Sequence, residues 1–434
     1  MKRLLKRFVP KEVFSLYHLA LAILGTVIYG LPGRKMVVIG VTGTKGKTSA
    51  ANFIWAALQS SGFKTGIITT ANIRIGDKEV LNKYHMTMPG RFVIQRLLSD
   101  MVKAGCTHVV VETTSEGIKQ FRHIGVFYDI AVFTNLTPEH LDSHGGSFEE
   151  YKRMKGKLFA SLNSGTRKNI LGQTVEKVSI VNSDSEYAEF FLSFPADRKI
   201  TYGFESSAEF QASQVREEES KVSFELGSEK YEINIAGEFN VLNALPAVVI
   251  AKLFDAERDD IQKGFDELAV IPGRMEFINE GQAFKVVVDY AHEKESMGKL
   301  LKIGRKLAGE KGKLMVLLGA EGGGRDKRKR FEMGELAGVL ADFVVVSSVD
   351  PYDDDPMKIA DDIANAAKEK GKTLNKDLFV VLDRREGVKK ALGLAKAGDV
   401  VLITGKGAEQ SIIERGVRTP WDDRAVTREE LKKL

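Results

Sequence analysis

The pattern of hydrophobic and polar positions predicts alternating strands and helices after Pro32-Gly33. Short apolar runs predict strands at residues 36–41, 107–112, 129–135 and 178–182, and segments with a helical period predict helices at 49–59, 91–104, 147–162 and 241–254. This alternation is typical of a largely parallel sheet with helices on its faces. Residues 221–236 instead predict a hairpin with a Gly-Ser turn.

A second alternating series starts near Phe284. Its predicted strands are 285–290, 314–319, 343–347, 378–382 and 400–404, and the helices between them are 294–307, 327–340, 356–370 and 386–395. We therefore expect an α/β protein with two doubly wound units. The predicted division is an N-terminal segment at 1–35, a central domain at 36–276 and a C-terminal domain at 277–434, with Pro272-Gly273 at the joint.

The charge of the chain is concentrated at its start. The first eleven residues contain five basic residues and no acid, which equals the net charge of +5 for the whole chain: Lys2, Arg3, Lys6, Arg7 and Lys11. The remaining residues have no net charge, so the sequence does not indicate a basic domain that binds nucleic acid. One cysteine, Cys106, excludes a disulfide framework and a cysteine-rich zinc site.

The segment Val41-Thr42-Gly43-Thr44-Lys45-Gly46-Lys47-Thr48 lies between a predicted strand and a predicted helix. This is the setting of a phosphate-binding loop, in which small residues let backbone N–H groups and a helix N-terminus face phosphate oxygens. Lys47 would reach the β- and γ-phosphates, and the Thr48 hydroxyl would bind Mg²⁺. The chain is therefore expected to use ATP or GTP.

Further polar residues follow predicted strands. Glu112 ends one strand, and the segment after the next strand holds His140 and His144 together with acids. Carboxylates at the carboxyl ends of parallel strands can hold Mg²⁺ near a phosphate loop. Histidine is an unusual ligand for Mg²⁺, which prefers oxygen.

These motifs resemble the Mur ligases, which form amide bonds from a carboxylate, an amine and ATP. The loop TGTKGKT is similar to the family's TGTNGKT, and DIAVFTNLTPEHLDSHGGSFEEYKRMKGKLF, residues 129–159, resembles the members that add the third residue of the peptidoglycan stem. In chain order the other matches are GEFNVLN at 237–243, PGRME at 272–276, DYAH at 289–292, GGGRDKRKR at 322–330 and GKG at 405–407.

The resemblance implies a Mur-ligase central ATPase domain, a C-terminal Rossmann-like domain and the following site residues. ATP binding is expected from Thr42, Gly43, Thr44, Lys45, Gly46, Lys47, Thr48, Asn243, Arg274, Asp289 and His292. Mg²⁺ binding is expected from Thr48, Glu112, His140 and Lys155, with Lys155 carbamylated, and the catalytic residues are expected to be Lys47, Lys155 and His140. Acceptor contacts are expected from Thr87, Thr114, Gln120 and Arg122, and amino-acid contacts from Asp350, Tyr352, Lys406 and Glu409.

The departures from the family bear on the substrates. About 35 residues precede the ATPase unit, so we expect the family's N-terminal uridine-nucleotide domain to be absent. The family's SSHAL becomes Thr-Ser-Glu-Gly-Ile at 114–118, and GKGHE becomes Gly-Lys-Gly-Ala-Glu at 405–409. The family's DNPR becomes Val-Asp-Pro-Tyr at 349–352, and Tyr352 cannot supply the positive charge that grips the distal carboxylate of diaminopimelate. A neutral or lysine-like amino acid is therefore expected.

The predicted function is ATP-dependent amide ligation through an acyl phosphate, with a muramoyl peptide as acceptor, UDP-linked or lipid-linked, in peptidoglycan precursor synthesis. One alternative is a ligase for another carboxylate, such as a folate-polyglutamate or cyanophycin-type substrate. A second is a non-catalytic nucleotide-binding membrane scaffold. We expect a monomer that does not bind nucleic acid.

Residues 13–31 contain no Asp, Glu, Lys or Arg and follow the basic start. Basic residues ahead of an apolar run stay in the cytoplasm, so a single crossing would place the ATPase unit outside, away from ATP. The segment is therefore expected either to lie on the inner face of the membrane as a peripheral anchor or to pack against the protein, and the enzyme is expected to be cytoplasmic.

Overall fold

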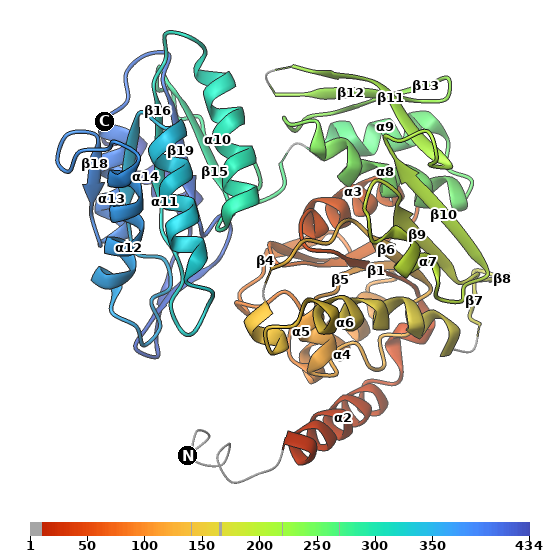
Figure 1. The fold of residues 1–434 in the computed structure, drawn as a ribbon. Coiled ribbons are helices and arrows are strands. Elements are labelled where there is room, and N and C mark those ends of the chain that lie inside the picture. Colours follow the sequence, from red (N-terminus) through yellow and green to blue (C-terminus); the bar gives the residue numbers. More distant parts are fainter. Residues whose placement is uncertain (1–10, 140, 165–166, 219, 269) are drawn as a thin grey trace. The chain divides into compact units, whose positions relative to one another are not determined.

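The computed structural model describes residues 11–139, 141–164, 167–218, 220–268 and 270–434. It divides the chain into two compact units, Met1–Ala269 and Val270–Leu434 (Figure 1). Each unit has its own sheet and its own core.

The sheet of unit 1 has a parallel centre and antiparallel margins. Its strands are β1 (Val37–Thr42), β2 (Thr65–Ile68), β3 (Asn72–Ile75), β4 (Lys78–Leu81), β5 (His108–Glu112), β6 (Ile130–Phe133), β9 (Val178–Asn182), β10 (Arg198–Gly203), β11 (Phe210–Glu217), β12 (Val222–Leu226) and β13 (Glu229–Ile233). The order of the described strands is β13-β12-β11-β10-β9-β6-β1-β5-β2-β3-β4. β1 lies between β5 and β6 and is parallel to both, so the loop that follows it opens at the carboxyl edge of the sheet.

Helices cover both faces of this sheet (Figure 1). The helices of unit 1 are α2 (Lys11–Ile28), α3 (Lys47–Ser60), α4 (Arg91–Lys103), α5 (Ser115–Lys119), α6 (Phe148–Ala160), α7 (Ala188–Leu192), α8 (Phe239–Leu253) and α9 (Arg258–Glu267). α3, α8 and α9 pack together on one face, while α4 and α6 share a core with alternate residues of the strands, among them Val109, Val111 and Phe133. Burial of both faces explains why the central strands are continuous apolar runs.

Unit 2 is a smaller doubly wound unit. Its strands are β14 (Glu276–Phe277), β15 (Lys285–Asp289), β16 (Leu314–Leu318), β17 (Phe343–Val346), β18 (Leu378–Val380) and β19 (Val400–Thr404), in the order β14-β15-β19-β16-β17-β18. Its helices are α10 (Lys294–Ala308), α11 (Arg328–Leu340), α12 (Pro356–Glu369), α13 (Arg384–Gly393) and α14 (Asp423–Leu431), and a hairpin of β20 (Ser411–Glu414) and β21 (Val417–Pro420) follows β19. Every pairing in the main sheet is parallel except that of β14 with β15.

The predicted α/β class with two doubly wound units is confirmed, and the predicted elements lie within a few residues of the observed ones. The hairpin predicted at 221–236 is β12 and β13, which extend the central sheet. The N-terminal apolar run forms α2, which packs on α4 (Figure 1). In the described part of the chain, no helix has the length and apolarity needed to cross a membrane.

Candidate nucleotide and ligation site

The phosphate loop has the predicted strand, turn and helix around it. β1 ends at Thr42 and α3 begins at Lys47, with Gly46 at its N-cap in the left-handed region at a φ of 77°. A Cβ added to Gly46 would lie 2.0 Å from Asn243 Oδ1, and one added to Gly43 would lie 2.0 Å from Thr134 Oγ1. Both positions therefore require glycine, because neighbouring side chains take the space that a Cβ would need.

A second segment, residues 134–139, holds this loop in place. The backbone N–H of Thr44 donates to the Asn135 carbonyl at 2.8 Å, and that of Lys45 donates to Asn135 Oδ1 at 2.8 Å. Thr134 Oγ1 donates to the Lys45 carbonyl at 2.7 Å, and Lys45 Nζ lies 2.9 Å from Glu139 Oε2. The loop is thus preorganised by side chains that follow β6.

Lys47 and Thr48 begin α3 at the carboxyl edge of the sheet. Lys47 Nζ donates to the Thr44 carbonyl at 2.8 Å, which places its ammonium over the loop. Thr48 Oγ1 donates to Glu112 Oε2 at 2.9 Å, and the same oxygen accepts the N–H of Thr70 at 2.8 Å. A hydroxyl and a carboxylate so close together form the hard-oxygen donor set that Mg²⁺ prefers, so these two residues fit the ion.

Lys155 lies directly behind the phosphate loop. Its side chain is 2% exposed, its Nζ donates to the Gly43 carbonyl at 2.6 Å, and the Tyr151 ring centroid is 4.4 Å from Nζ. Burial lowers the pKa of Lys155 well below the usual value and Lys47 lowers it further, against opposing effects of Glu139 and Glu112. This environment favours the neutral amine, the form that can add CO₂ and become a carbamate.

His140 lies outside the described residues, so its predicted role as a metal ligand stays a prediction. The neighbouring His144 is buried, and its Nε2 is 3.0 Å from Ser115 Oγ at the start of α5. Burial lowers the pKa of His144, and Lys119 and Lys155 lower it further, so a neutral ring is favoured there.

The predicted acceptor residues form two groups in unit 1. Thr87 Oγ1 lies 2.8 Å from Thr70 Oγ1, which in turn contacts Glu112. Arg122 donates to Gln120 Oε1 at 2.7 Å and to the Met88 carbonyl.

Thr114, the remaining predicted acceptor residue, caps α5 by accepting the N–H of Gly117 at 3.1 Å. In this structure its side chain therefore has a local structural role at the start of α5.

Asn243 is the predicted nucleotide residue of α8. Its Nδ2 donates to Asn240 Oδ1 at 2.9 Å, while its Oδ1 lies against Gly46. The structure therefore brings Asn243 to the phosphate loop, while its contact with the nucleotide stays a prediction.

The predicted nucleotide residues of unit 2 gather where β15 ends. Asp289 accepts the N–H of Met275 through Oδ2 and that of Ala291 through Oδ1, both at 2.8 Å. The Arg274 guanidinium lies 4.4 Å from the centroid of the Tyr290 ring, and His292 Nδ1 is 2.8 Å from the Tyr290 carbonyl oxygen. The motifs PGRME at 272–276 and DYAH at 289–292 therefore lie side by side.

Three of the predicted amino-acid residues form a buried charged cluster. Lys406 Nζ donates to Asp350 Oδ2 at 2.7 Å and to Glu409 Oε2 at 2.5 Å. Asp350 also accepts the N–H of Ile413 at 2.7 Å, and Tyr290 donates to Glu409 at 3.1 Å. Burial alone would lower the pKa of Lys406, but Glu409 and Asp350 raise it, so the lysine remains a cation.

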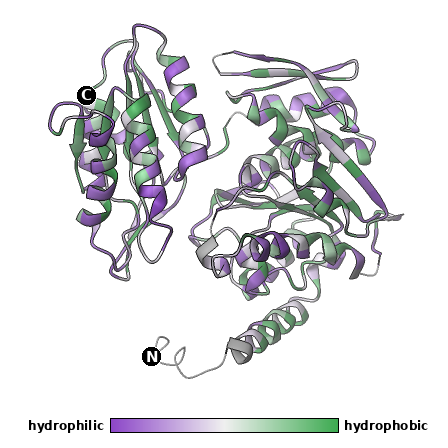
Figure 2. Cartoon of the chain, in the orientation of Figure 1, coloured by the Kyte–Doolittle hydropathy of each residue, from purple (hydrophilic) through white to green (hydrophobic). Residues whose placement is uncertain are grey.

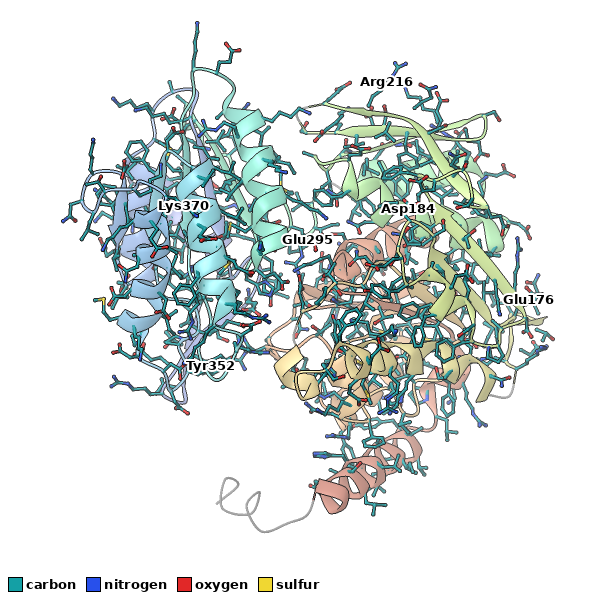
Figure 3. The ribbon with its side chains drawn as sticks, viewed as in Figure 1. Glu176, Asp184, Arg216, Glu295, Tyr352 and Lys370 are labelled. Carbon is teal, nitrogen blue, oxygen red and sulfur yellow. The ribbon has the colours of Figure 1, made fainter. Side chains whose placement is uncertain are left out.

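Tyr352 (labelled in Figure 3) lies in unit 2 with a φ of 53° and is tied to the β20–β21 hairpin through the N–H of Arg415. Burial raises the pKa of Tyr352 to about 12, Glu321 and Asp350 raise it too, and a hydrogen bond to Arg325 opposes them. Glu321 lies 3.5 Å from Arg325. Arg325 belongs to the motif matched at 322–330, but the sequence analysis assigned no role to it or to Glu321.

Comparisons with known proteins match both units of the chain to one family. The profile of the Mur ligase middle domain matches residues 41–251, and that of the Mur ligase glutamate ligase domain matches residues 273–407. The UDP-N-acetylmuramoyl-L-alanyl-D-glutamate–2,6-diaminopimelate ligase of Halalkalibacterium halodurans is 36% identical over 436 residues, covering 99% of this chain and 85% of the relative. The UDP-N-acetylmuramyl-tripeptide synthetase of a Roseiflexus species is 35% identical, covering 96% and 82%.

Solved structures give the same fold. A UDP-N-acetylmuramoyl-L-alanyl-D-glutamate–2,6-diaminopimelate ligase superposes with a TM-score of 0.60 at 27% identity, covering 92% of this chain and 79% of the other. The folylpolyglutamate synthase of Mycobacterium tuberculosis superposes with a TM-score of 0.70, covering 96% and 95%. The identity is 19%, so the similarity to the folylpolyglutamate synthase supports a shared fold and nothing further.

Proposed function

The chain belongs to the Mur ligase family, and from this premise we propose that it joins an amino acid to the carboxylate of a muramoyl peptide at the expense of ATP. The observation that carries the proposal is the arrangement behind and beside the phosphate loop. Lys47, the Thr48–Glu112 pair and the buried Lys155 converge there from three different elements. A protein that only bound nucleotide would not require a buried lysine at this place.

In the proposed reaction, the acceptor carboxylate attacks the γ-phosphoryl group of ATP and becomes an acyl phosphate. The amine then attacks the acyl carbon, and phosphate leaves as the amide forms. Lys47 and the N–H groups at the start of α3 stabilise the charge on the transferring phosphoryl group. When bound, Mg²⁺ would neutralise further phosphate charge.

Thr48 would hold one Mg²⁺-binding position, and we propose that Glu112 and Lys155, as its carbamate, contribute to a second. The neutral amine favoured at Lys155 supports this step, because a carbamate turns a buried cation into an anionic oxygen ligand. His140 completes the proposed set by resemblance. The catalytic residues are thus proposed to be Lys47, Lys155 and His140.

For the acceptor we propose contacts from Thr87, Thr114, Gln120 and Arg122, whose hydroxyl, amide and guanidinium groups suit a ligand that carries phosphate and carboxylate. The Asp350–Lys406–Glu409 cluster provides both signs of charge, as the α-amino and α-carboxylate groups of an amino acid require. The polyglutamate-type alternative is weaker, because relatives at about 35% identity over nearly the whole chain are named as muramoyl-peptide ligases.

We propose that the enzyme is cytoplasmic, because ATP and the precursors are found there, and that it lies at the inner face of the membrane. The proposed form is a monomer.

Phosphate release in a pairwise panel of carboxylate acceptors and amino acids tests the proposed function. We expect rapid release only when a muramoyl dipeptide and an amino acid are present together. Release with a folate substrate and glutamate, but with no muramoyl peptide, would favour the polyglutamate alternative. No release with any pair would favour a nucleotide-binding scaffold.

A further inference from the structure

Helix α2 has two faces with different surroundings. On its inner face, Ala22 and Thr26 are buried, and a Cβ added to Gly25 would touch Arg91 and Phe92 at the start of α4. Thr26 Oγ1 donates to the Ala22 carbonyl at 2.8 Å, so the polar group of this face is satisfied within the helix. These contacts fix which side of α2 is turned away from α4.

The outer face of α2 is apolar, and its large side chains are exposed among the residues that the structure describes. Its large side chains, which we call the outer strip, are between 49% and 66% exposed: Leu16, Tyr17, Ile23, Leu24, Val27 and Ile28. Their spacing follows the helical period, so they form one continuous strip along the helix axis. Figure 2 shows the hydrophobic colouring along α2. A continuous exposed apolar strip of this kind marks a binding surface.

We propose that the outer strip binds an anionic lipid surface, with α2 lying in the plane of the membrane. The charge at the start of the chain supports lipid as the partner, because Lys2, Arg3, Lys6, Arg7 and Lys11 directly precede the strip in sequence. Each basic residue near an anionic leaflet adds attraction, and the apolar strip adds burial in the interface. The remainder of the chain is balanced in charge, so the attraction is confined to this end.

The size of the outer strip argues against a second copy of the chain as its partner. The outer strip consists of six side chains on one face of a helix of 18 residues. A stable interface between two proteins involves about 20–30 residues and buries about 800 Å² on each partner. Insertion into a lipid surface has no such lower limit, because affinity there grows with each buried side chain.

Flotation of the full chain with lipid vesicles tests this proposal, and it requires no substrate. We expect the protein to float with phosphatidylglycerol-containing vesicles, to float less with pure phosphatidylcholine vesicles, and to be released as salt is raised. Val27→Glu should lower the bound fraction at least about tenfold, because it removes apolar burial and adds a repelled charge.

Val339→Glu is the matched control, since Val339 is 64% exposed on α11 of unit 2 and Val27 is 61% exposed. It should float like the wild type. Equal flotation of the wild type and Val27→Glu would overturn the proposal. A wild-type dimer that Val27→Glu converts to a monomer, with no lipid binding by either, would assign the strip to a second copy instead and would also overturn it. Leu16→Glu, at the other end of the outer strip, is a second test variant and should lose flotation as Val27→Glu does.

Discussion

Lys155 Nζ donates a 2.6 Å hydrogen bond to the carbonyl oxygen of Gly43, which joins the middle of α6 to the first residue of the phosphate loop. A buried ammonium at this position is costly, and burial lowers the pKa of Lys155 accordingly. The same position would suit an anionic group that faces a metal ion. From its sequence neighbours alone Lys155 would be interpreted as a surface lysine, but in the structure it is buried against the phosphate loop and belongs to the proposed site.

Lys155→Ala should reduce ligation to a trace, because the proposed carbamate oxygen is lost. A small carboxylic acid such as acetate or formate should restore part of the activity, since it can place an oxygen in the space that the side chain leaves. The measurement is the initial rate of ADP formation with and without the added acid.

Arg153→Ala is the control for that variant. Arg153 lies on the same helix, its side chain is 62% exposed and it pairs with Glu150, so its loss should leave the rate nearly unchanged. Full activity of Lys155→Ala, together with full activity of the wild type in buffers depleted of CO₂, would show that no carbamate is needed.

Lys47→Ala should abolish turnover. The transferring phosphoryl group would lose its main cationic partner, which corresponds to a loss of about 3 kcal/mol or more of transition-state stabilisation. Steady-state kinetics should show the loss mainly in kcat. A variant that retains near-normal ligation would contradict the role assigned to the phosphate loop.

Tyr352→Arg should shift the amine preference toward diaminopimelate. Arginine would supply a guanidinium for the distal carboxylate, and the gain in kcat/KM for diaminopimelate should be about tenfold or more. The wild type should prefer a neutral or lysine-like amino acid in a competition assay. If the wild type clearly prefers diaminopimelate, another cation must bind the distal carboxylate. Arg325, which lies beside Tyr352, is the first candidate.

His108 should make unit 1 sensitive to acid. Burial lowers the pKa of His108 to about 4, against a usual value of 6.5, because the ring packs between Phe63 and Phe254. Between these two pH values the unfolded chain binds the proton and the folded chain does not, so stability falls as pH falls from about 6.5 to about 4. The full loss from this residue is about 3 kcal/mol.

His108→Phe keeps an aromatic ring at the position and removes the titrating group. Melting temperatures measured from pH 8 to pH 4.5 should fall less steeply for this variant than for the wild type, while above pH 7.5 the two should follow parallel curves. Equally steep acid losses would show that His108 is not the residue responsible.

The sequence predicted the main strands and helices well because both sheets are buried on two faces. The apolar runs that became β1, β5, β9 and β19 are continuous, and the helices between them have a clear period. β2 and the hairpin of β3 and β4 were not predicted. β2 is only four residues long and contains Thr65 and Gly66, and three of the four residues of β4 are exposed, so neither gives a strong pattern.

The candidate site was predictable where its residues adjoin one another in sequence, as at the phosphate loop. Lys155 was found only by resemblance, because its burial depends on how α6 packs against the loop after β1. The roles of Asn135 and Glu139 in holding the loop were not predicted, since a contact between residues about ninety positions apart leaves no local pattern. Arg325 was missed for a similar reason, as its partner Tyr352 lies on a different loop.

The central claim is that an acceptor carboxylate is activated by phosphoryl transfer, and an oxygen-isotope experiment tests it most directly. A muramoyl dipeptide labelled with ¹⁸O in its terminal carboxylate is incubated with the protein, ATP, Mg²⁺ and the preferred amino acid, and the released phosphate is analysed by mass spectrometry. The account predicts that one ¹⁸O atom moves into each phosphate released, and that Lys47→Ala gives no labelled phosphate. Phosphate that carries no label, although the amide forms, would contradict the account.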